Sequence, residues 1–288
     1  MESNLVELRE AIIASFPELR SCRFSLHTIG WDSFAVDVDD RLIFKFPRHA
    51  EAERRLRAEA GILAAVRPAV TMPLPKLQLF EGPPFFSQHV KLKGEHLLAA
   101  QYEKLPCKAR ERLAADVALF FAELHALDDA MMTAAGAGPI GSWLPPDDIL
   151  REAWPLLPPE LRGYAERSIK VWQDLDADPH GKPYGHFDSH GWNMAFDHSE
   201  QRLNGIYDFG DSGFGDLHKE FIHPSWIAPD FVERLAMEYE RLTGRVIDLR
   251  RVKLICGVLR LSELGGAEPA RAEAMVKSVA DWAKYQET

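Results

Sequence analysis

The stretch from Tyr184 to Asp216, YGHFDSHGWNMAFDHSEQRLNGIYDFGDSGFGD, decides how the rest of the chain is interpreted. It contains His186-Phe187-Asp188, then Asn193, then Asp208-Phe209-Gly210. An aspartate on a short loop can accept the proton of an attacking hydroxyl, and an asparagine and a second aspartate can each give an oxygen to Mg²⁺ that bridges nucleotide phosphates. We therefore predict that Asp188 is catalytic and that Asn193 and Asp208 hold the metal ion.

The segment between the two motifs is predicted to be a β-hairpin. An apolar run at 194–196 is followed by a polar cluster at 197–202, and 203–207 then lead back to Asp208. A hairpin that starts at Asn193 puts both proposed ligands at the same end of paired strands. The spacing also matches the H-x-D-x-x-x-x-N and D-F-G pattern of kinase catalytic and metal loops.

Composition describes an ordinary globular protein. The 288 residues suit one large domain or two lobes, with 46% hydrophobic and 27% charged residues. The net charge of −10 disfavours nucleic acid as a partner, and no apolar run is long enough to span a bilayer. The N-terminus shows no signal peptide, and the three cysteines are scattered. We expect a cytoplasmic protein, a monomer or weak dimer, without structural zinc or disulfides.

The first 90 residues predict a small sheet and one main helix. Strands are expected near 23–28, 34–38, 42–46, 76–80 and 85–90, and a helix over 50–63. On the third strand, Lys45 faces away from the phenylalanines beside it, where a rigidly held cation can neutralise phosphate charge. Such a lysine needs an acidic partner, and Glu59 on the helix is the candidate, with Glu51 and Glu53 as competitors.

Three further residues are predicted to contact the nucleotide. The turn 30–33 contains a single glycine, but it can offer backbone N–H groups and the Ser33 hydroxyl to phosphate oxygens. The backbone from Gln88 to Val90 is expected to pair with the base, and 91–94 to form the hinge to the second lobe. From residue 106 the chain is predicted to be mainly helical, with helices over 109–127, 159–175, 229–243, 249–264 and 269–285 and a loop over 134–146.

These motifs resemble, in order, the aminoglycoside phosphotransferase family of small-molecule kinases, which also includes choline kinase-like enzymes, and most closely its 2″-phosphotransferase-like branch. The resemblance is carried by segments between residues 30 and 221, namely 30–32, 43–48, 93–94, 186–188, 193 and 207–216. It implies an α+β, protein-kinase-like bilobal fold, with an N-lobe at 1–91 and a C-lobe at 92–288. It also implies Mg²⁺-dependent transfer of the γ-phosphoryl group of ATP or GTP to a hydroxyl.

Position by position, the resemblance implies that Lys45 contacts the α- and β-phosphates and that Glu59 pairs with it. Asp188 would be the catalytic aspartate, with Asn193 and Asp208 as metal ligands. The sequence departs from the family at Phe187, where glycine is usual, at Leu217, where proline is usual, and at Glu220, where aspartate is common. The reacting groups are retained, so the departures put the surroundings and the substrate in doubt. His186 is expected to anchor the loop.

Two other interpretations use the same residues. His186, Asp188 and His190, with His198 nearby, could hold Zn²⁺ for hydrolysis, but that leaves Lys45 and the second motif unexplained. The chain could also be a nucleotide-binding module without catalysis, although no motif residue is lost.

The acceptor is predicted only as a small molecule with a hydroxyl group. A polyamine such as an aminoglycoside needs carboxylates near Asp188, and Asp211 and Glu220 are the candidates among the acidic residues of the second lobe. Related kinases act on choline, homoserine or methylthioribose, so a small metabolic alcohol is an equal alternative.

Overall fold

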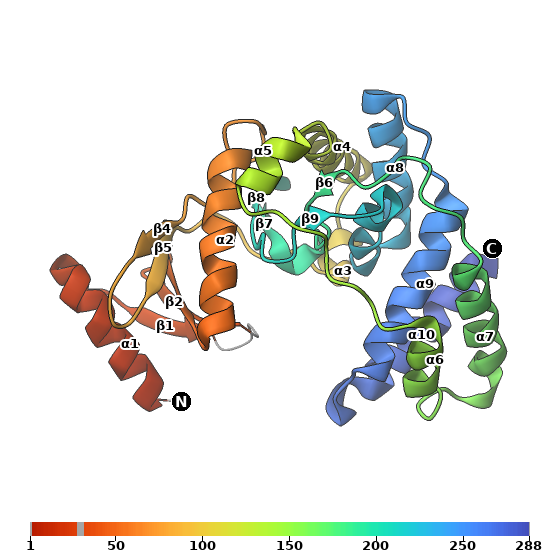
Figure 1. Ribbon diagram of the computed structural model, residues 1–288, viewed down its shortest axis with the longest axis horizontal. Coiled ribbons are helices and arrows are strands. Elements are labelled where there is room, and N and C mark those ends of the chain that lie inside the picture. Colours follow the sequence, from red (N-terminus) through yellow and green to blue (C-terminus); the bar gives the residue numbers. More distant parts are fainter. Residues whose placement is uncertain (1, 28–31, 288) are drawn as a thin grey trace.

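A five-stranded antiparallel sheet forms the N-terminal part of the computed structural model, which describes residues 2–27 and 32–287 (Figure 1). The strand order is β1-β2-β3-β5-β4, so β5 lies between β3 and the short edge strand β4. The strands are β1 (Phe24–His27), β2 (Ser33–Val38), β3 (Leu42–Pro47), β4 (Gln78–Phe80) and β5 (Phe86–Val90).

The two faces of this sheet have different partners because side chains alternate along each strand. Phe44 and Phe46 are buried on one face, in a cluster that also contains Ile12 of helix α1 (Glu2–Ser15). Lys45 lies on the opposite face, where helix α2 (Ala50–Val66) covers it. The alternation predicted for the third strand is confirmed.

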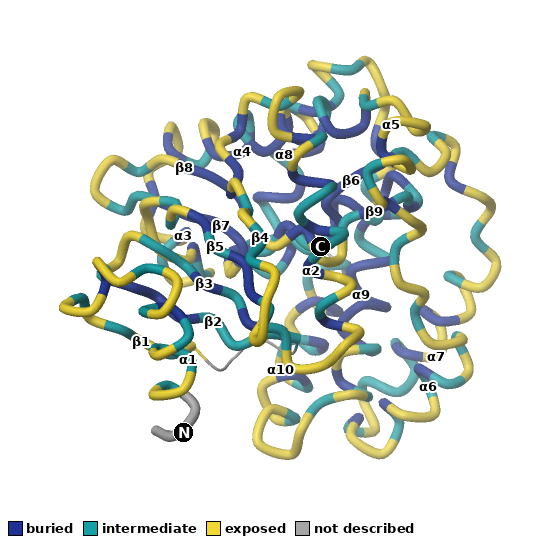
Figure 2. Tube along the Cα trace, turned by 60° about the vertical axis from the view of Figure 1, so that its left-hand side comes forward, coloured by how far each residue is buried: buried dark blue, intermediate teal, exposed yellow. Residues whose placement is uncertain are grey.

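The rest of the chain is mostly helical. Its helices are α3 (Ala99–Tyr102), α4 (Cys107–Leu124), α5 (Asp129–Ala134), α6 (Pro146–Ala153), α7 (Pro159–Gln173), α8 (Pro229–Thr243), α9 (Leu249–Gly265) and α10 (Pro269–Glu287). Helix α4 packs on α8, and α9 packs on α6, α7 and α10. Figure 2 shows that the buried residues run through the inner strands and along these helix contacts.

Local signals explain where several of these helices begin and end. Proline occupies the first helical position of α6, α7, α8 and α10, where its missing N–H leaves no hydrogen bond unmade. Helix α8 ends at Gly244, whose φ of 71° is left-handed and therefore suits glycine. The four long helices predicted after residue 158 are confirmed, whereas the short helices α3, α5 and α6 were not predicted.

The predicted hairpin between the two motifs is confirmed. Strands β7 (Met194–Asp197) and β8 (Arg202–Ile206) pair antiparallel, with Met194 opposite Ile206, and Tyr207 N–H donates to the carbonyl of Asn193. A second two-stranded pair, β6 (Tyr184–Gly185) and β9 (Gly213–Phe214), flanks it. Asn193 and Asp208 therefore emerge from the same end of the hairpin.

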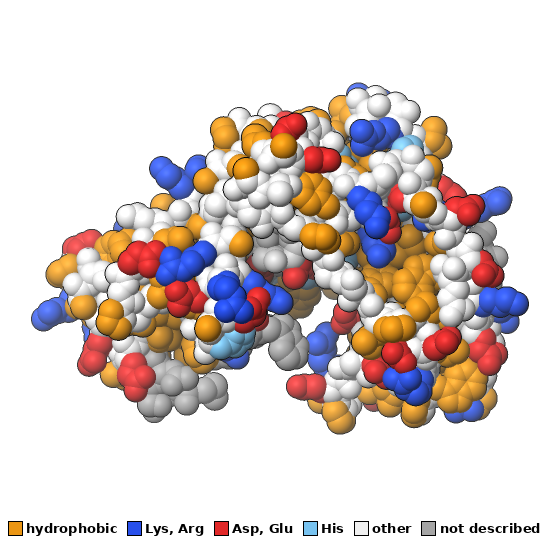
Figure 3. All heavy atoms as spheres, in the orientation of Figure 1, with side chains coloured by type: hydrophobic (Ala, Val, Ile, Leu, Met, Phe, Trp, Pro, Cys, Tyr) orange, Lys and Arg blue, Asp and Glu red, His pale blue; other side chains and the backbone are white. Residues whose placement is uncertain are grey.

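Figure 3 shows a hollow in this face of the molecule, between the part that carries the sheet and the part that carries α6 and α10. The division of the chain at residues 91 and 92 stays a prediction. Within the described residues, none of the helices combines the length and the apolar character that crossing a bilayer requires.

Candidate active site

The lysine predicted to contact phosphate lies in a cluster of opposite charges. Lys45 Nζ lies 3.2 Å from Glu59 Oε1 and 3.6 Å from Asp208 Oδ1. Strand β3 and helix α2 thus meet the second motif at one ammonium group. Glu59 Oε1 also accepts from Phe209 N–H at 3.3 Å, so the same carboxylate holds the backbone next to Asp208.

This cluster keeps Lys45 charged. Burial by itself lowers the pKa of an ammonium group, but the carboxylates of Glu59 and Asp208 outweigh it, so the pKa of Lys45 is raised above its usual value. Glu59 is 5% exposed and Asp208 is more open, with about half of its side chain exposed. One carboxylate therefore anchors the lysine while the other faces the solvent.

The residues predicted to contact the nucleotide lie near this lysine. Ser33 begins β2, and because Ala35 pairs with Lys45 and Ser33 with Pro47, Ser33 shares the face of Lys45. Gly30 and Trp31 of the predicted phosphate turn lie outside the described residues. Strand β4 pairs with β5 only as far as Gln88, so beyond it that edge of β5 has no partner strand in the described part of the chain.

The edge of β5 ends in an exposed residue. Val90 is 68% exposed, and its carbonyl lies 3.0 Å from Nδ1 of His89. The structure thus brings Ser33, Gln88 and Val90 to the sheet that carries Lys45, and their contacts with a nucleotide stay predictions.

The catalytic loop is fixed by His186 and by the backbone. His186 Nε2 lies 3.1 Å from the Tyr207 carbonyl, and Nδ1 accepts from the N–H of Asp188 at 3.3 Å. The acceptor role of Nδ1 implies that Nε2 carries the proton and donates to Tyr207. The ring is fully buried, edge-on to Phe209, so His186 ties the catalytic loop to the second motif.

Phe187 adopts a left-handed conformation with φ of 57°, which glycine adopts without strain and phenylalanine does not. Its N–H donates to Glu220 Oε1 at 2.9 Å, and its side chain is 7% exposed. Gly185 leaves room for this carboxylate, because a Cβ there would collide with Glu220 Oε2. The surrounding contacts therefore hold the loop in a conformation that its own sequence disfavours.

The Asp188 carboxylate is contacted on both oxygens. Oδ2 accepts from Asn193 Nδ2 at 2.7 Å, while Oδ1 lies 3.3 Å from His190 Nε2 and 2.9 Å from His223 Nδ1. Burial by itself raises the pKa of this carboxyl, but His223 and His190 outweigh it, so the pKa of Asp188 lies below its usual value. Asp188 is therefore ionised at neutral pH, as a proton acceptor must be.

His223 was not predicted. It is the first residue of the 3₁₀ helix η4 (His223–Trp226), well after the second motif, and no local pattern marks it. Only the folded chain brings it to Asp188.

The residues present fit a Mg²⁺ ion. The Asn193 side-chain N–H groups donate to Asp188, which leaves the amide oxygen for another partner, and Asp208 presents a half-exposed carboxylate at the same end of the hairpin. Amide and carboxylate oxygens are the ligands that Mg²⁺ takes, usually few in number and completed by phosphate and water. In the part of the chain that the structure describes, no three His, Cys, Asp or Glu residues form a metal site by themselves.

Asp211 and Glu220, the two residues predicted to contact the acceptor, differ in their exposure to solvent. Asp211 is exposed at the residue level, but protein atoms crowded around its carboxyl group and the charges of Asp188 and Asp208 raise its pKa. Glu220 is fully buried, where it contacts Phe187 and, at 3.4 Å, His125. The structure does not place Glu220 where an acceptor can reach it, and its carboxylate supports the loop instead.

The geometry does not support the zinc interpretation. Both ring nitrogens of His186 face groups inside the protein, and His198 Nε2 lies 3.1 Å from the carbonyl of His96. Neither histidine can turn to a metal at Asp188 without losing these contacts.

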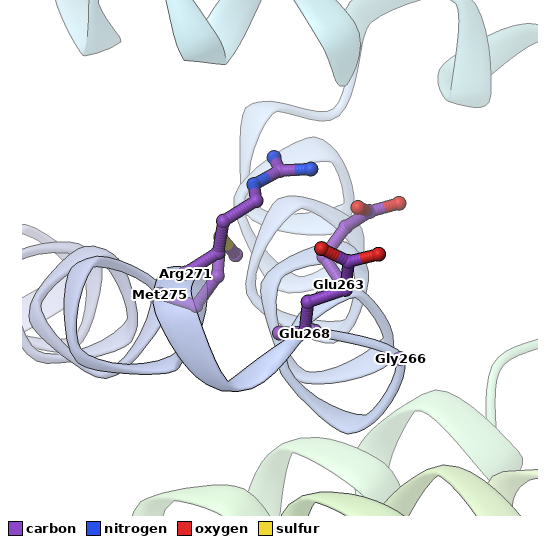
Figure 4. A pocket seen from close by; sticks show the side chains of 6 residues that line it. Glu263, Gly266, Glu268, Arg271 and Met275 are labelled. Carbon is purple, nitrogen blue, oxygen red and sulfur yellow. The ribbon is translucent and has the colours of Figure 1, made fainter.

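Two cavities lie outside the residues predicted for the site. One, of about 360 Å³, lies between α3, η4, α9 and α10 and includes Arg260. The other, of about 170 Å³, lies where α9 turns into α10 (Figure 4). Glu263, Glu268 and Arg271 line this second cavity together with Met275.

Comparison with known proteins identifies a family. Residues 24–255 match the model of the phosphotransferase enzyme family. No protein of the curated set matches the sequence.

Solved structures with a similar fold are aminoglycoside and macrolide phosphotransferases. The GDP complex of wild-type aminoglycoside 2'-phosphotransferase-IIIa is 21% identical, with 99% of this chain and 98% of that chain covered and a TM-score of 0.79. The GDP and kanamycin complex of APH(2")-IIia is 20% identical, with 98% of each chain covered and a TM-score of 0.77. The macrolide 2'-phosphotransferase MphH from Brachybacterium faecium is 17% identical, covering 96% of this chain and 98% of that one, with a TM-score of 0.64. The predicted α+β, protein-kinase-like fold is confirmed.

Proposed function

Because the chain belongs to the phosphotransferase enzyme family, we propose that it is a Mg²⁺-dependent kinase that transfers the γ-phosphoryl group of ATP or GTP to a hydroxyl of a small acceptor. The observation that carries the proposal is the convergence of two charge clusters. Lys45 lies between Glu59 and Asp208, and Asp188 and Asn193 lie at the same end of the hairpin as Asp208.

Each of these residues has one task in phosphoryl transfer. Lys45 binds the α- and β-phosphates, and Glu59 holds the lysine in place. Asn193 and Asp208 would hold Mg²⁺, which would neutralise negative charge on the phosphates. Asp188 orients the acceptor hydroxyl and accepts its proton as the oxygen bonds to the γ-phosphorus, while the bond from that phosphorus to the β-phosphate oxygen breaks and the nucleoside diphosphate leaves. The protein contributes mainly position and charge, because the transition state of this transfer is loose.

The sheet supplies the remaining nucleotide contacts in this proposal. The open edge of β5 from Gln88 to Val90 offers backbone groups to the base, and Ser33 offers its hydroxyl to a phosphate oxygen. GDP complexes of similar structures favour this use of the fold, since those proteins bind a guanine nucleotide.

Two acceptor classes are consistent with the fold. The similar structure with kanamycin favours an aminoglycoside, and the carboxylate of Asp211 near Asp188 suits a cationic acceptor. A small metabolic alcohol is the second class, since the histidines beside Asp188 add no negative charge for a polyamine. From composition alone we expect a cytoplasmic monomer or weak dimer.

A turnover screen tests the proposal. ATP and GTP with Mg²⁺ are each offered with a panel of aminoglycosides, macrolides and small alcohols, and the Asp188→Ala variant is the control. Phosphorylation that Asp188→Ala abolishes supports the kinase and names the acceptor class. Failure of both nucleotides to raise the Tm would overturn the proposal. Nucleotide binding without any Asp188-dependent hydrolysis or transfer would favour a silent binding module.

A further inference from the structure

We infer that His223 is a further positioning residue of the reaction, one that orients the Asp188 carboxylate from the side opposite Asn193. The inference rests on the proposed function and adds a residue from outside the two motifs. It starts from the number of hydrogen bonds that a carboxylate can accept, which is about four.

The surroundings of Asp188 leave His223 as its main partner on one oxygen. Asn193 occupies Oδ2 at 2.7 Å, and Oδ1 lies 2.9 Å from His223 Nδ1 and 3.3 Å from His190 Nε2. Without a partner on Oδ1, the carboxylate can turn about its Cβ–Cγ bond, because that torsion is broad. Partners on both oxygens fix the plane of the carboxylate and thereby the direction of its free lone pair.

The Nδ1 atom of His223 also has no other use in the fold. It is buried and makes no aligned hydrogen bond to any described residue, and Asp188 is its ion-pair neighbour. A buried polar atom without a hydrogen-bond partner is unfavourable. Hydrogen bonds of catalytic groups are often poorly aligned before substrate binds and tighten in the complex. A small rotation of the His223 ring toward Oδ1 would satisfy this nitrogen.

The segment that carries His223 is itself fixed. The guanidinium of Arg260 in α9 donates hydrogen bonds to the backbone carbonyl of Ser225, at 3.1 Å, and to the Ser225 hydroxyl, at 3.0 Å. The guanidinium lies 4.3 Å from the ring centre of Trp226 and 4.1 Å from that of Trp282. Arg260 is 4% exposed, so these contacts are made inside the protein. Helix α9 therefore holds η4, and η4 presents His223 to Asp188.

The test uses substitutions that keep or remove one nitrogen. In His223→Asn the amide nitrogen takes the place of Nδ1, in His223→Gln the amide nitrogen lies near the position of Nε2, and His223→Leu removes both. We expect kcat to fall on the order of 10-fold to 100-fold in His223→Leu and His223→Gln, because the Asp188 carboxylate is then poorly oriented toward the acceptor hydroxyl. In His223→Asn we expect kcat to stay within about 3-fold of the wild-type value. The KM for nucleotide should be unchanged, because His223 contacts none of the nucleotide residues.

The assays separate the inference from the proposed function. Transfer of the γ-phosphoryl group to water is measured in the presence of nucleotide and Mg²⁺. Transfer of the same group to an acceptor is measured with whichever acceptor the screen identifies. His180→Leu, a half-buried histidine that contacts Val246 and His218, is the matched control and should keep full activity. The Tm of each variant identifies loss of folding.

Three results would overturn the inference. His223→Leu with unchanged kcat would show that Asp188 needs no second partner. Equal losses in all three His223 variants, with lowered Tm, would assign a structural role. If the wild-type protein shows no Asp188-dependent turnover, the proposed function fails and the inference falls with it, whereas the first two results leave the proposed function standing.

Discussion

The lysine of the sheet and the aspartate of the catalytic loop are held in opposite ways. Lys45 Nζ is held by the buried carboxylate of Glu59 at 3.2 Å, and the two residues lie on β3 and α2, which follow one another in the sequence. Asp188 is fixed by Asn193 and two histidines, the nearer of which comes from a distant segment. Breaking the buried ion pair of Lys45 is strongly unfavourable, whereas the contact of His223 with Asp188 is poorly aligned and can tighten when substrate binds. We therefore expect the Lys45–Glu59 pair to keep its geometry when nucleotide binds, and the contacts of Asp188 to change when the acceptor binds.

The largest expected effect lies on the acceptor side. Asp188→Ala should lower kcat on the order of 10²–10⁴, which corresponds to about 3–5 kcal/mol of barrier, because no other described carboxylate shares its partners. Single-turnover transfer measures it. Asp188→Asn, which keeps the shape and removes the charge, should be similarly slow. Near wild-type turnover in either variant would contradict the role of Asp188.

On the nucleotide side, Glu59→Ala should lower the free energy of unfolding by about 3 kcal/mol, because it leaves the Lys45 charge without its buried partner. Denaturant titration measures this loss, and nucleotide affinity should fall with it. The matched control is Glu53→Ala on the same helix, which removes a surface pair with Arg57 and should change stability by less than about 1 kcal/mol. Equal losses of stability in the two variants would contradict the view that the buried Lys45–Glu59 pair contributes more than a surface ion pair.

We expect His89 in the sheet to make the free energy of unfolding fall at acidic pH. Burial lowers the pKa of His89 in β5 to about 4 from an ordinary value of 6.5. As pH falls from 6.5 to 4, the unfolded chain takes up a proton that the folded chain refuses, so stability is lost over this window, up to about 3 kcal/mol. His89→Asn should remove this part of the pH dependence of unfolding. His27→Asn, at an exposed histidine, should retain it, and an unchanged slope in His89→Asn would contradict the prediction.

The smallest expected effect concerns the support of the catalytic loop. Glu220→Ala removes the acceptor for Phe187 N–H inside the protein and should lower the free energy of unfolding by about 1–3 kcal/mol, with some loss of kcat. Glu220→Gln keeps an acceptor oxygen and should be milder. Thermal unfolding and turnover together check this. If Glu220→Ala raised only the KM for acceptor at full stability, Glu220 would be a substrate contact after all.

Much of the fold was predictable because its signals are local. Alternating apolar residues marked the strands around Lys45. Helical periodicity marked α7 to α10, and a proline stands at the first position of α7, α8 and α10. The short helices α3, α5 and α6 were not predicted because about two turns or fewer give too little periodicity to recognise. For the site, the spacing of the motifs was enough to select the residues that meet at the hairpin end.

The sequence by itself determined the set of reacting residue types and the hairpin that aligns Asn193 with Asp208, since neighbouring residues along two paired strands decide both. Only the tertiary structure decided that Glu220 is buried under Phe187 and that His223 reaches Asp188. The Glu220 contact depends on where the 3₁₀ helix Leu217–Phe221 packs, and the His223 contact depends on how η4 packs against α9. Packing between segments far apart in the chain leaves no periodic trace in either of them.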